Sequence, residues 1–260
     1  MKFYKSEIFG KVQEPESFDE IIKYINSVIS DAYDVWIWRG QGNIAWPIHS
    51  SAFRKLSLDK KEVTENRMCH YEENILNLAT HKGYRYLHGR ELTDFELLAR
   101  LRHHGVATRL IDGSRNLLIG IFFCVNDKPN NTGMLIGLKT HYLGGYEGLP
   151  EFTTYEKKMK DIKDLDYPQT WEPSVIDSRV AAQHSQFLYS RVSKKSTGSL
   201  EISENEDSRL CLAISPDLKE KSLDILNRIY DIRYITLFPD IEGFGYVYSQ
   251  KTKQSDSYRW

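Results

Sequence analysis

Residues 103–116, HHGVATRLIDGSRN, gather many hydrogen-bonding side chains between two apolar stretches. A helix that ends at Gly105, a short strand over 106–112 and a new helix from about residue 116 would bring this run to one edge of a core. Its polar side chains would then line one ligand site, because alternation along a strand turns every second residue the same way. The candidates are His104, Thr108, Arg109, Asp112, Ser114 and Asn116.

Purely structural roles compete with this interpretation. Arg109 and Asp112 could pair with each other, and Ser114 or Asn116 could cap the helix that follows. A single cap does not need so many polar side chains, so we expect a ligand site. A zinc site is disfavoured, because two adjacent histidines on a regular helix do not face one metal ion and no acid follows four positions later.

A second polar group lies in WRGQGNIAWPIHSSAFR, residues 38–54. The preceding VWIW run has strand propensity, so Arg39, Gly40 and Gln41 are expected at a strand end. The guanidinium could bind phosphate or carboxylate, and the glycine permits close backbone approach. The alternative is a buried ion pair within an aromatic core. No P-loop or GxGxxG sequence is present. Stacking surfaces could come from Trp36, Trp38 and Trp46.

A third group, RVAAQHSQF, covers residues 179–187. It places Gln183 at the entry to a strand, where the amide could contact a ligand. The common hydrolase classes are disfavoured, because the sequence has no GxSxG or HExxH motif and no convincing Cys-His pair.

The surrounding sequence predicts the elements that would hold these groups. Capping-box spacing predicts helices over 18–29 and 94–104. Strands and helices follow without a steady βαβ alternation, which indicates an α+β domain. Residues 140–173 lack a clear period and are expected to be a long loop or insertion. Other expected elements are a charged helix over 59–80, a buried helix over 116–125, strands over 133–139 and 210–214, a helical turn and strand over 178–192, a helix over 215–229 and, over 233–249, a strand, a turn and an extended piece.

Composition limits the functional classes. The chain has 260 residues, 40% of them apolar, with 35 basic and 36 acidic residues, so any binding of nucleic acid must use a local patch. Three cysteines without CxxC spacing argue against a zinc knuckle or a disulfide framework. No signal-like segment and no run of about 18 apolar residues is present. We therefore expect a cytoplasmic protein that does not bind membranes.

Taken in order, these blocks resemble the FRG domain, a bacterial family named for its Phe/Tyr-Arg-Gly motif. The resemblance covers residues 36–244 and is most specific at HHGVATRLID. It rests on WRGQ, SSAFR, LLARLRHHGVATRLIDGSRNLLIGIFFCV, RVAAQHSQF and TLFPDIEGF. The chain departs from the family at Gly113 and Ser114, where Trp-Thr is usual, at Leu117, where proline is usual, and at Ser185, where glycine is usual. The Gly113 change removes an aromatic wall from the expected pocket.

The block order is similar to that of ADP-ribosyltransferases. That resemblance implies a mixed, split central sheet surrounded by helices, as one domain over residues 35–260 with an N-terminal helical segment, residues 1–34, packed on it. It also implies NAD as co-substrate. Arg39 would hold the pyrophosphate or the nicotinamide ribose, while Asp112 and Ser114 would line the nicotinamide pocket. The remaining cofactor contacts would be Gly40, Gln41, Thr108, Arg109 and Asn116.

The third block fits this resemblance poorly, because Gln183 stands near the position of the catalytic glutamate and carries no charge. Two alternatives remain open. In the first, Gln183 positions a ribose hydroxyl, and Asp112 or another acid such as Glu72 acts on the acceptor. His104 then serves as a base. In the second alternative, the protein is not an enzyme.

We expect an ADP-ribosyltransferase that acts on a macromolecule, as a bacterial toxin in a toxin-antitoxin or phage-defence system with an antitoxin partner. Nucleic acid, RNA or DNA, is slightly favoured over protein as acceptor, because basic clusters accompany frequent aromatic residues. These are Lys55, Lys60 and Lys61, and Lys157, Lys158 and Lys160. The alternatives are a non-catalytic nucleotide-sensing or protein-binding module and a metal-independent nuclease.

Overall fold

A mixed sheet of nine strands forms the centre of the computed structural model, which describes residues 1–29 and 35–249. The strand order is β1-β2-β11-β7-β3-β6-β10-β9-β8. Two neighbouring pairs, β2 with β11 and β8 with β9, are parallel, and the other pairs are antiparallel. The strands are β1 (Lys2–Ser6), β2 (Gly10–Glu14), β3 (Trp36–Gln41), β6 (Ile111–Ser114), β7 (Gly133–Lys139), β8 (Gly144–Tyr146), β9 (Gln169–Trp171), β10 (Ser185–Tyr189) and β11 (Arg209–Ile214).

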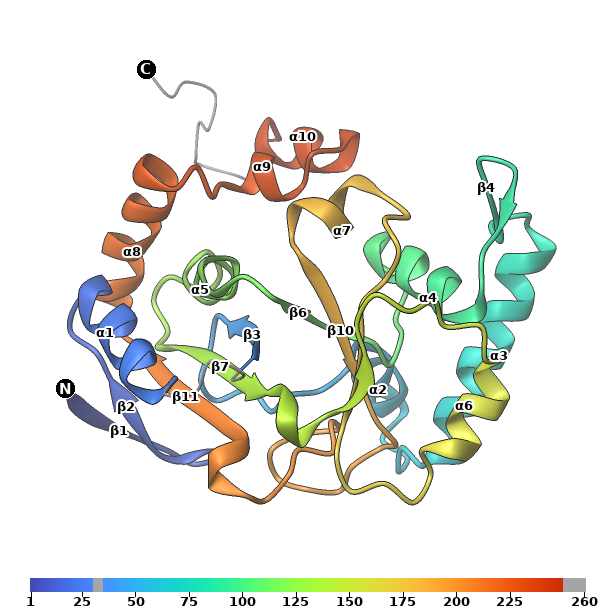
Figure 1. Ribbon diagram of the computed structural model, residues 1–260, viewed down its shortest axis with the longest axis horizontal. Helices are drawn as coiled ribbons and strands as arrows, with labels where there is room; N and C mark the ends of the chain where they lie inside the picture. The colour runs from blue at the N-terminus through green and yellow to red at the C-terminus, as the bar shows by residue number, and fades with distance from the viewer. Residues whose placement is uncertain (30–34, 250–260) are drawn as a thin grey trace.

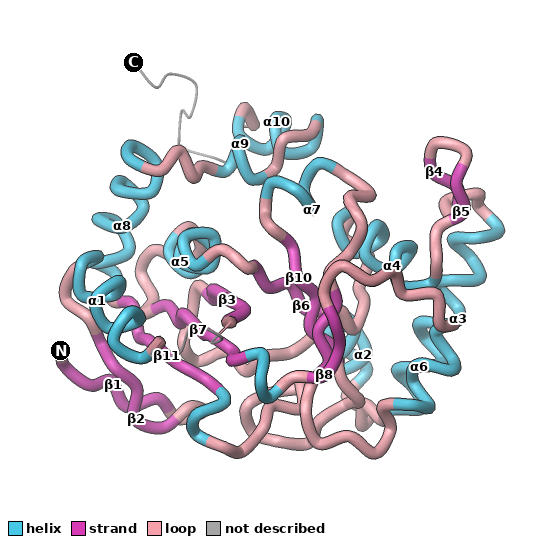
Figure 2. Tube along the Cα trace, viewed as in Figure 1, coloured by secondary structure: helices cyan, strands magenta, loops and turns pink. Residues whose placement is uncertain are grey.

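Helices flank this sheet in two groups (Figure 1). One group, α1, α5 and α8, shares a core with β3, β7 and β11, and the other, α3, α4 and α6, shares a core with β9 and β10. Loops fill much of the remaining surface (Figure 2). The helices are α1 (Phe18–Val28), α2 (Ser51–Leu56), α3 (Glu65–His81), α4 (Asp94–His103), α5 (Leu117–Val125), α6 (Tyr155–Asp161), α7 (Ser178–Ala182), α8 (Pro216–Ile229), α9 (Tyr234–Leu237) and α10 (Ile241–Val247). Short 3-10 turns lie at Ser57–Asp59, Thr140–Tyr142 and Glu206–Ser208, and a separate small hairpin comprises β4 (Tyr86–Leu87) and β5 (Arg90–Glu91).

Alternation along β3 explains its sequence. Trp36 and Trp38 are buried in the core formed with α5 and α8, whereas Ile37 is buried in a separate core with Ile111 and the loop residue Ile48. The central strand is therefore apolar on both sides, as expected for a strand covered on both faces.

The predicted mixed α+β class is confirmed, with a large mixed sheet flanked by helices. Several predicted elements are also present. Ser17 caps α1, and Thr93 and Glu96 form a capping box at the start of α4. Gly105 follows that helix with a φ of +80°, in the left-handed region that favours glycine. The expected boundary at residue 34 lies outside the described residues.

Several parts of the chain differ from the prediction. The N-terminal segment contains the hairpin of β1 and β2 in addition to its helix, and residues 140–173 contain β8, α6 and β9. The strand expected over 106–112 covers only Ile111–Ser114. No clear hydrophobic period marks these short elements, so their partners in the sheet determine them.

The C-terminal prediction of strand and extended chain over 233–249 is wrong, because this segment forms α9 and α10. Its aromatic residues raise strand propensity, but helical spacing stacks Tyr234 on Phe238 with ring centroids 4.3 Å apart. The Asp240 side chain accepts a hydrogen bond from the backbone N–H of Gly243 at 2.8 Å and caps α10. Local capping and stacking therefore outweigh strand propensity here.

A buried polar network joins α3, α6 and the loop before β6. Arg109, only 3% exposed, donates from Nε to Glu72 at 2.5 Å and from Nη2 to Tyr155 at 2.6 Å. It also donates from Nη1 to Glu65 at 2.8 Å. Burial lowers the pKa of Arg109, but Tyr155, Glu72 and Glu65 outweigh that effect and raise it above its ordinary value. This cation is therefore neutralised inside the core.

Within residues 1–29 and 35–249, no helix has the length and apolar character needed to cross a membrane.

Replacing Glu72 with alanine should destabilise the protein strongly, because it removes a fully buried partner of a buried cation. We expect the free energy of unfolding, measured by urea denaturation, to fall by about 3–5 kcal/mol. Glu73→Ala is the control, since this neighbour makes no hydrogen bond to the residues described, and it should change the free energy by about 0.5 kcal/mol or less. Equal losses in both variants would contradict the role of the network.

Candidate functional site

The contact between β3 and β6 in the middle of the sheet is narrow. The two strands share one paired position, Trp38 with Ser114, whereas β3 and β7 share six. Beyond that position the Arg39 side chain bridges the strands, with Nη1 donating to the backbone carbonyl of Asp112 at 2.6 Å. A side chain therefore makes a contact that a backbone ladder would otherwise make.

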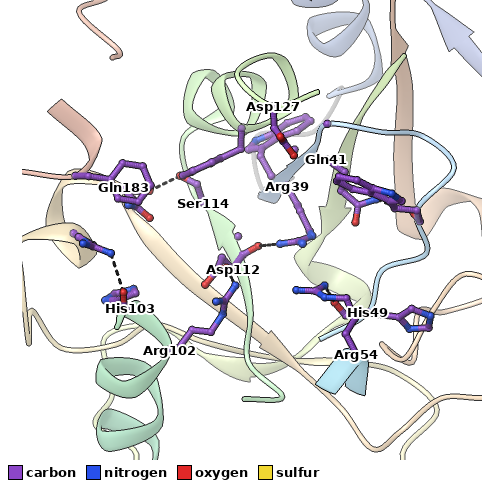
Figure 3. A pocket seen from close by; sticks show the side chains of 18 of the residues that line it. Arg39, Gln41, His49, Arg54, Arg102, His103, Asp112, Ser114, Asp127 and Gln183 are labelled. Atoms are coloured by element: carbon purple, nitrogen blue, oxygen red, sulfur yellow. Dashed lines mark hydrogen bonds and ion pairs between the residues drawn. The ribbon is translucent and has the colours of Figure 1, made fainter. Parts of the chain in front are cut away.

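A cavity of about 760 Å³ opens at this junction. Figure 3 shows side chains from separate parts of the chain converging on it. Its walls come from the end of β3 and the loop after it, from β6, and from α7 and the segment after α9. The lining residues are Trp38, Arg39, Gly40, Gln41, Gly42, Trp46, Pro47, His49, Arg54, Arg102, His103, Asp112, Gly113, Ser114, Phe123, Asp127, Arg179, Gln183 and Phe238.

Gly40 and Gln41 fix the position of Arg39 on the β3 wall. A Cβ on Gly40 would lie 2.2 Å from the backbone N of Cys124, so only glycine lets β3 lie this close to α5. Gln41 is buried, and its Nε2 donates to the carbonyl of Trp46 at 3.0 Å, which holds the following loop. The sequence motif Arg-Gly-Gln is thus explained by packing on both sides of Arg39.

Cations outnumber acids at the floor of the cavity. Arg102 Nη2 donates to the Asp112 carboxylate at 2.6 Å, and Arg54 Nη1 donates to the carbonyl of His49 at 2.7 Å. Burial, reinforced by Arg102 and Arg54, lowers the pKa of Arg39 to about 10, which keeps it charged at neutral pH. One carboxylate thus faces three arginines, and such a site favours an anion.

Asp112 is ionised in this setting. Burial raises the pKa of its carboxyl group, but the charges of Arg102 and Arg39, together with His103, outweigh it and hold the pKa below its ordinary value. Asp112 therefore helps to hold the arginines in place and reduces their mutual repulsion.

The opposite wall is tied to β6 by hydrogen bonds. Ser114 Oγ donates to the carbonyl of Gln183 at 2.7 Å, and Gln183 Nε2 donates to the carbonyl of Leu237 at 2.9 Å. Arg179 donates to Asp240 and, through Nη2, to Glu242 at 2.8 Å. The segment that follows α7 and the C-terminal helices α9 and α10 are therefore held at the cavity by polar contacts.

Six of the residues that the sequence analysis proposed as catalytic or cofactor-binding line this cavity together, although they come from three separate blocks. They are Arg39, Gly40, Gln41, Asp112, Ser114 and Gln183. They lie in β3, in β6 and just before β10, which are adjacent strands.

Thr108 and Arg109 do not line the cavity, contrary to expectation. Thr108 is fully buried and contacts Ser51 through its backbone, and Arg109 belongs to the buried network with Glu72. Glu72 is likewise remote from the lining residues. The sequence suggested a strand through 106–112, but residues 106–110 do not form one, so the expected alternation does not apply to them.

Asn116 and His104 also lie outside the lining residues. Asn116 is the N-cap of α5 and accepts a hydrogen bond from the N–H of Leu118 at 2.9 Å, so its structural role is sufficient. His104 is exposed, with its Nδ1 3.0 Å from Glu242, and no role as a base in the cavity follows for it. The suggested pairing of Arg109 with Asp112 is wrong as well, because Asp112 pairs with Arg102.

Sequence reasoning missed several side chains of the cavity, among them Arg54, Arg102, Asp127, Arg179 and Phe238. Arg54 ends the block SSAFR and Arg102 lies in the block LLARLRHH. Their positive charge was the sequence feature that could have indicated an anion site. Asp127 follows the apolar helix without any motif. Among the residues described, no group of three or more His, Cys, Asp or Glu side chains could hold a metal ion.

Acidification should release α10 from the cavity. Hydrogen bonding to Arg179 lowers the pKa of Asp240 to about 2 from 3.8. A carboxylate with a depressed pKa stabilises the fold above its ordinary pKa and loses that contribution as the pH falls, here between about 4 and about 2. Hydrogen exchange of the amides in α9 and α10 should therefore accelerate over this interval.

Asp240→Asn should give the same faster exchange at neutral pH, because asparagine keeps the cap of α10 but cannot form the ion pair. The control is Asp224→Asn, which removes an exposed ion pair with Arg228 on α8. Unchanged exchange in Asp240→Asn would contradict a role for Asp240 in holding α10.

Comparison with curated proteins and with solved structures gives no match. The family model of the FRG domain does match, over residues 34–133. The matched segment includes β3, β6 and α5, and therefore Arg39, Asp112 and Ser114. We conclude that the chain carries an FRG domain over residues 34–133.

Proposed function

We propose that the cavity binds NAD and that the chain is an NAD-dependent ADP-ribosyltransferase acting on a macromolecule. The adjacency of β3, β6 and β10 carries this proposal. The resemblance noted in the sequence assigns to three such strands an Arg-Gly pair, a Ser-containing motif before an apolar helix, and the catalytic acid. Here the corresponding residues Arg39, Ser114 and Gln183 line one cavity.

The charge distribution of the cavity suits the pyrophosphate of a dinucleotide. Two carboxylates, those of Asp112 and Asp127, line the cavity with Arg39, Arg54 and Arg102, so an excess of positive charge remains. The further arginine of the lining, Arg179, is paired with Asp240 and Glu242. A guanidinium group can donate two parallel hydrogen bonds to a phosphate. We assign Arg39 as the main phosphate contact, because β3 and β6 both fix its position.

The remaining walls suit aromatic rings. Trp38, Phe123 and Phe238 line the cavity, and Trp46 lies at its edge with 39% of its surface exposed. The cavity volume falls within the range of about 300–1,000 Å³ that is usual for small-molecule sites. A dinucleotide with two rings and two phosphates matches this combination of apolar walls and arginines better than a simple anion does.

Gln183 limits what this cavity can do by itself. Breaking the bond between ribose and nicotinamide develops positive charge on the ribose, which a carboxylate usually stabilises. An amide can orient a ribose hydroxyl but cannot balance this charge. The neutral Gln183 is also the observation that favours the second candidate function, a non-catalytic module that senses a nucleotide or binds a protein through the same cavity.

For the acceptor we propose nucleic acid, RNA or DNA. Arg54 lines the cavity on α2, and the same segment continues into Lys55, Lys60 and Lys61. These three lysines are exposed and form no ion pair with any residue described. Exposed Trp46, which lines the cavity together with Arg54, offers a stacking surface. In the other basic cluster, Lys158 and Lys160 pair with Glu151 and Glu156 on or beside α6, away from the lining residues.

An enzyme that consumes NAD and modifies nucleic acid would harm the cell that contains it. We therefore propose a toxin in a toxin-antitoxin or phage-defence system, acting in the cytoplasm with an antitoxin protein as its partner.

Arg39→Ala should weaken NAD binding measured by isothermal titration calorimetry. Loss of a hydrogen bond to a charged group predicts a Kd that is higher by about tenfold or more. Arg228→Ala is the control, because Arg228 lies exposed on α8 outside the lining residues. Absence of NAD binding by the wild type, or equal Kd values for both variants, would contradict the assignment of the cavity.

Incubation with labelled NAD and cell lysate should place the label on nucleic acid. Replacing Lys55, Lys60 and Lys61 with glutamine should reduce this labelling. It should also make nucleic-acid binding less dependent on salt, lowering the slope of log K against log salt concentration by up to about 2 for a single strand and about 3 for a duplex if three phosphate contacts are lost. NAD affinity should not change. The charge-matched control replaces Lys157, Lys160 and Lys163. Label on protein would assign a different acceptor, and an equal loss in both triple variants would contradict the proposed surface.

A further inference from the structure

One acidic side chain of the cavity has no partner among the residues that the structure describes. Asp127 comes directly after Asn126, the C-cap of α5, and it is exposed while lining the cavity. Figure 3 shows it apart from Asp112. Within residues 1–29 and 35–249, no hydrogen bond or ion pair reaches the Asp127 carboxylate. Asp112, in contrast, is bound by Arg102.

This position is unfavourable for a negative charge. The last carbonyl groups of a helix carry partial negative charge, so a carboxylate just beyond the end of α5 is repelled by the helix dipole. An acid in this position needs a compensating cation. The structure provides one from α8.

Lys219 supplies that compensation without pairing with the carboxylate. The side chain is buried, with 1% exposed, and Nζ donates to the carbonyls of Gly42 at 2.7 Å, Asp127 at 2.8 Å and Lys128 at 3.0 Å. An ammonium group has three donors, and these three carbonyls use all of them. Lys219 therefore fixes the backbone of Asp127 and leaves its side chain free.

Close packing against β3 fixes Asp127 further. A Cβ on Gly42 would lie 2.7 Å from the carbonyl oxygen of Asp127 and 2.9 Å from its Cβ, so this contact requires glycine. Gly42 directly follows β3, which carries Arg39. The base of the Asp127 side chain is thus held at a defined place relative to the proposed phosphate contact.

From these contacts we infer that Asp127 is the catalytic carboxylate of the proposed reaction and that Lys219 positions it. The inference rests on the proposed function. Gln183 has no charge, and the charge of Asp112 is shared among neighbouring arginines. Asp127 combines a free carboxylate with a backbone fixed by Lys219 and Gly42, and a preorganised charge of this kind stabilises charge that develops in a transition state.

The proposed transfer of ADP-ribose breaks one bond of NAD and forms one bond to the acceptor. The bond between ribose C1′ and the nicotinamide nitrogen breaks, and its electron pair stays on that nitrogen, so nicotinamide leaves as a neutral molecule. The Asp127 carboxylate stabilises the positive charge that develops on the ribose. An acceptor hydroxyl or amine then bonds to C1′ and releases its proton to water, and no oxidant or reductant is required.

The test compares Asp127→Asn with wild type in two measurements, nicotinamide release under saturating NAD and the Kd for NAD by calorimetry. We expect nicotinamide release to fall by roughly 100-fold or more, since the substitution removes charge stabilisation in the transition state. The Kd should stay within about threefold, because this interaction strengthens only as charge develops. Asp161→Asn is a matched control, because Asp161 is an exposed aspartate at the C-terminal end of α6, outside the cavity lining, and it should retain wild-type release.

The outcomes separate the two proposals. Wild-type release of nicotinamide with equal release by Asp127→Asn would overturn the inference and leave the proposed function standing. A wild type that releases no nicotinamide would contradict the proposed function and the inference with it. A parallel loss of NAD binding and of release in Asp127→Asn would also overturn the inference, because it would assign Asp127 to ground-state binding.

Discussion

The single paired position between β3 and β6 determines where this protein can hold a ligand. A continuous ladder would have closed the sheet at this point. Instead, the strands pair at Trp38 and Ser114, and the Arg39 guanidinium bonds to the carbonyl of Asp112. This arrangement leaves a cavity beside the sheet junction and places a half-buried cation in its floor. The positions of Arg54, Arg102 and Asp127 matter because they surround this opening.

Two arginines in this domain illustrate how neighbours decide the role of a charge. Arg109 is surrounded by Glu72, Glu65 and Tyr155, which satisfy its donors inside the core. Arg39 has one carbonyl partner, and its Nε has none among the described residues. A half-buried guanidinium with unused donors, like that of Arg39, is suited to an anionic ligand, whereas a fully paired buried one, like that of Arg109, is suited to stability.

The predictable parts of the fold were those with local signals. Helices with capping residues, such as α1 after Ser17 and α4 after Thr93, follow from short-range sequence. The hairpin of β1 and β2 and the helices after residue 233 depend on packing and stacking partners instead. The candidate site followed the same rule. Arg39 and Ser114 stand in recognisable motifs, but the partner of Arg109 lies 37 residues earlier in the chain, and no motif marks Asp127.

The central claim is that the opening between β3 and β6 is an NAD site. A crystal structure of the protein grown with saturating NAD tests this most directly. The account predicts that the pyrophosphate contacts the Arg39 guanidinium and that the ribose bound to nicotinamide lies beside the Asp127 carboxylate. NAD bound elsewhere on the protein, or a cavity without NAD at saturation, would contradict it.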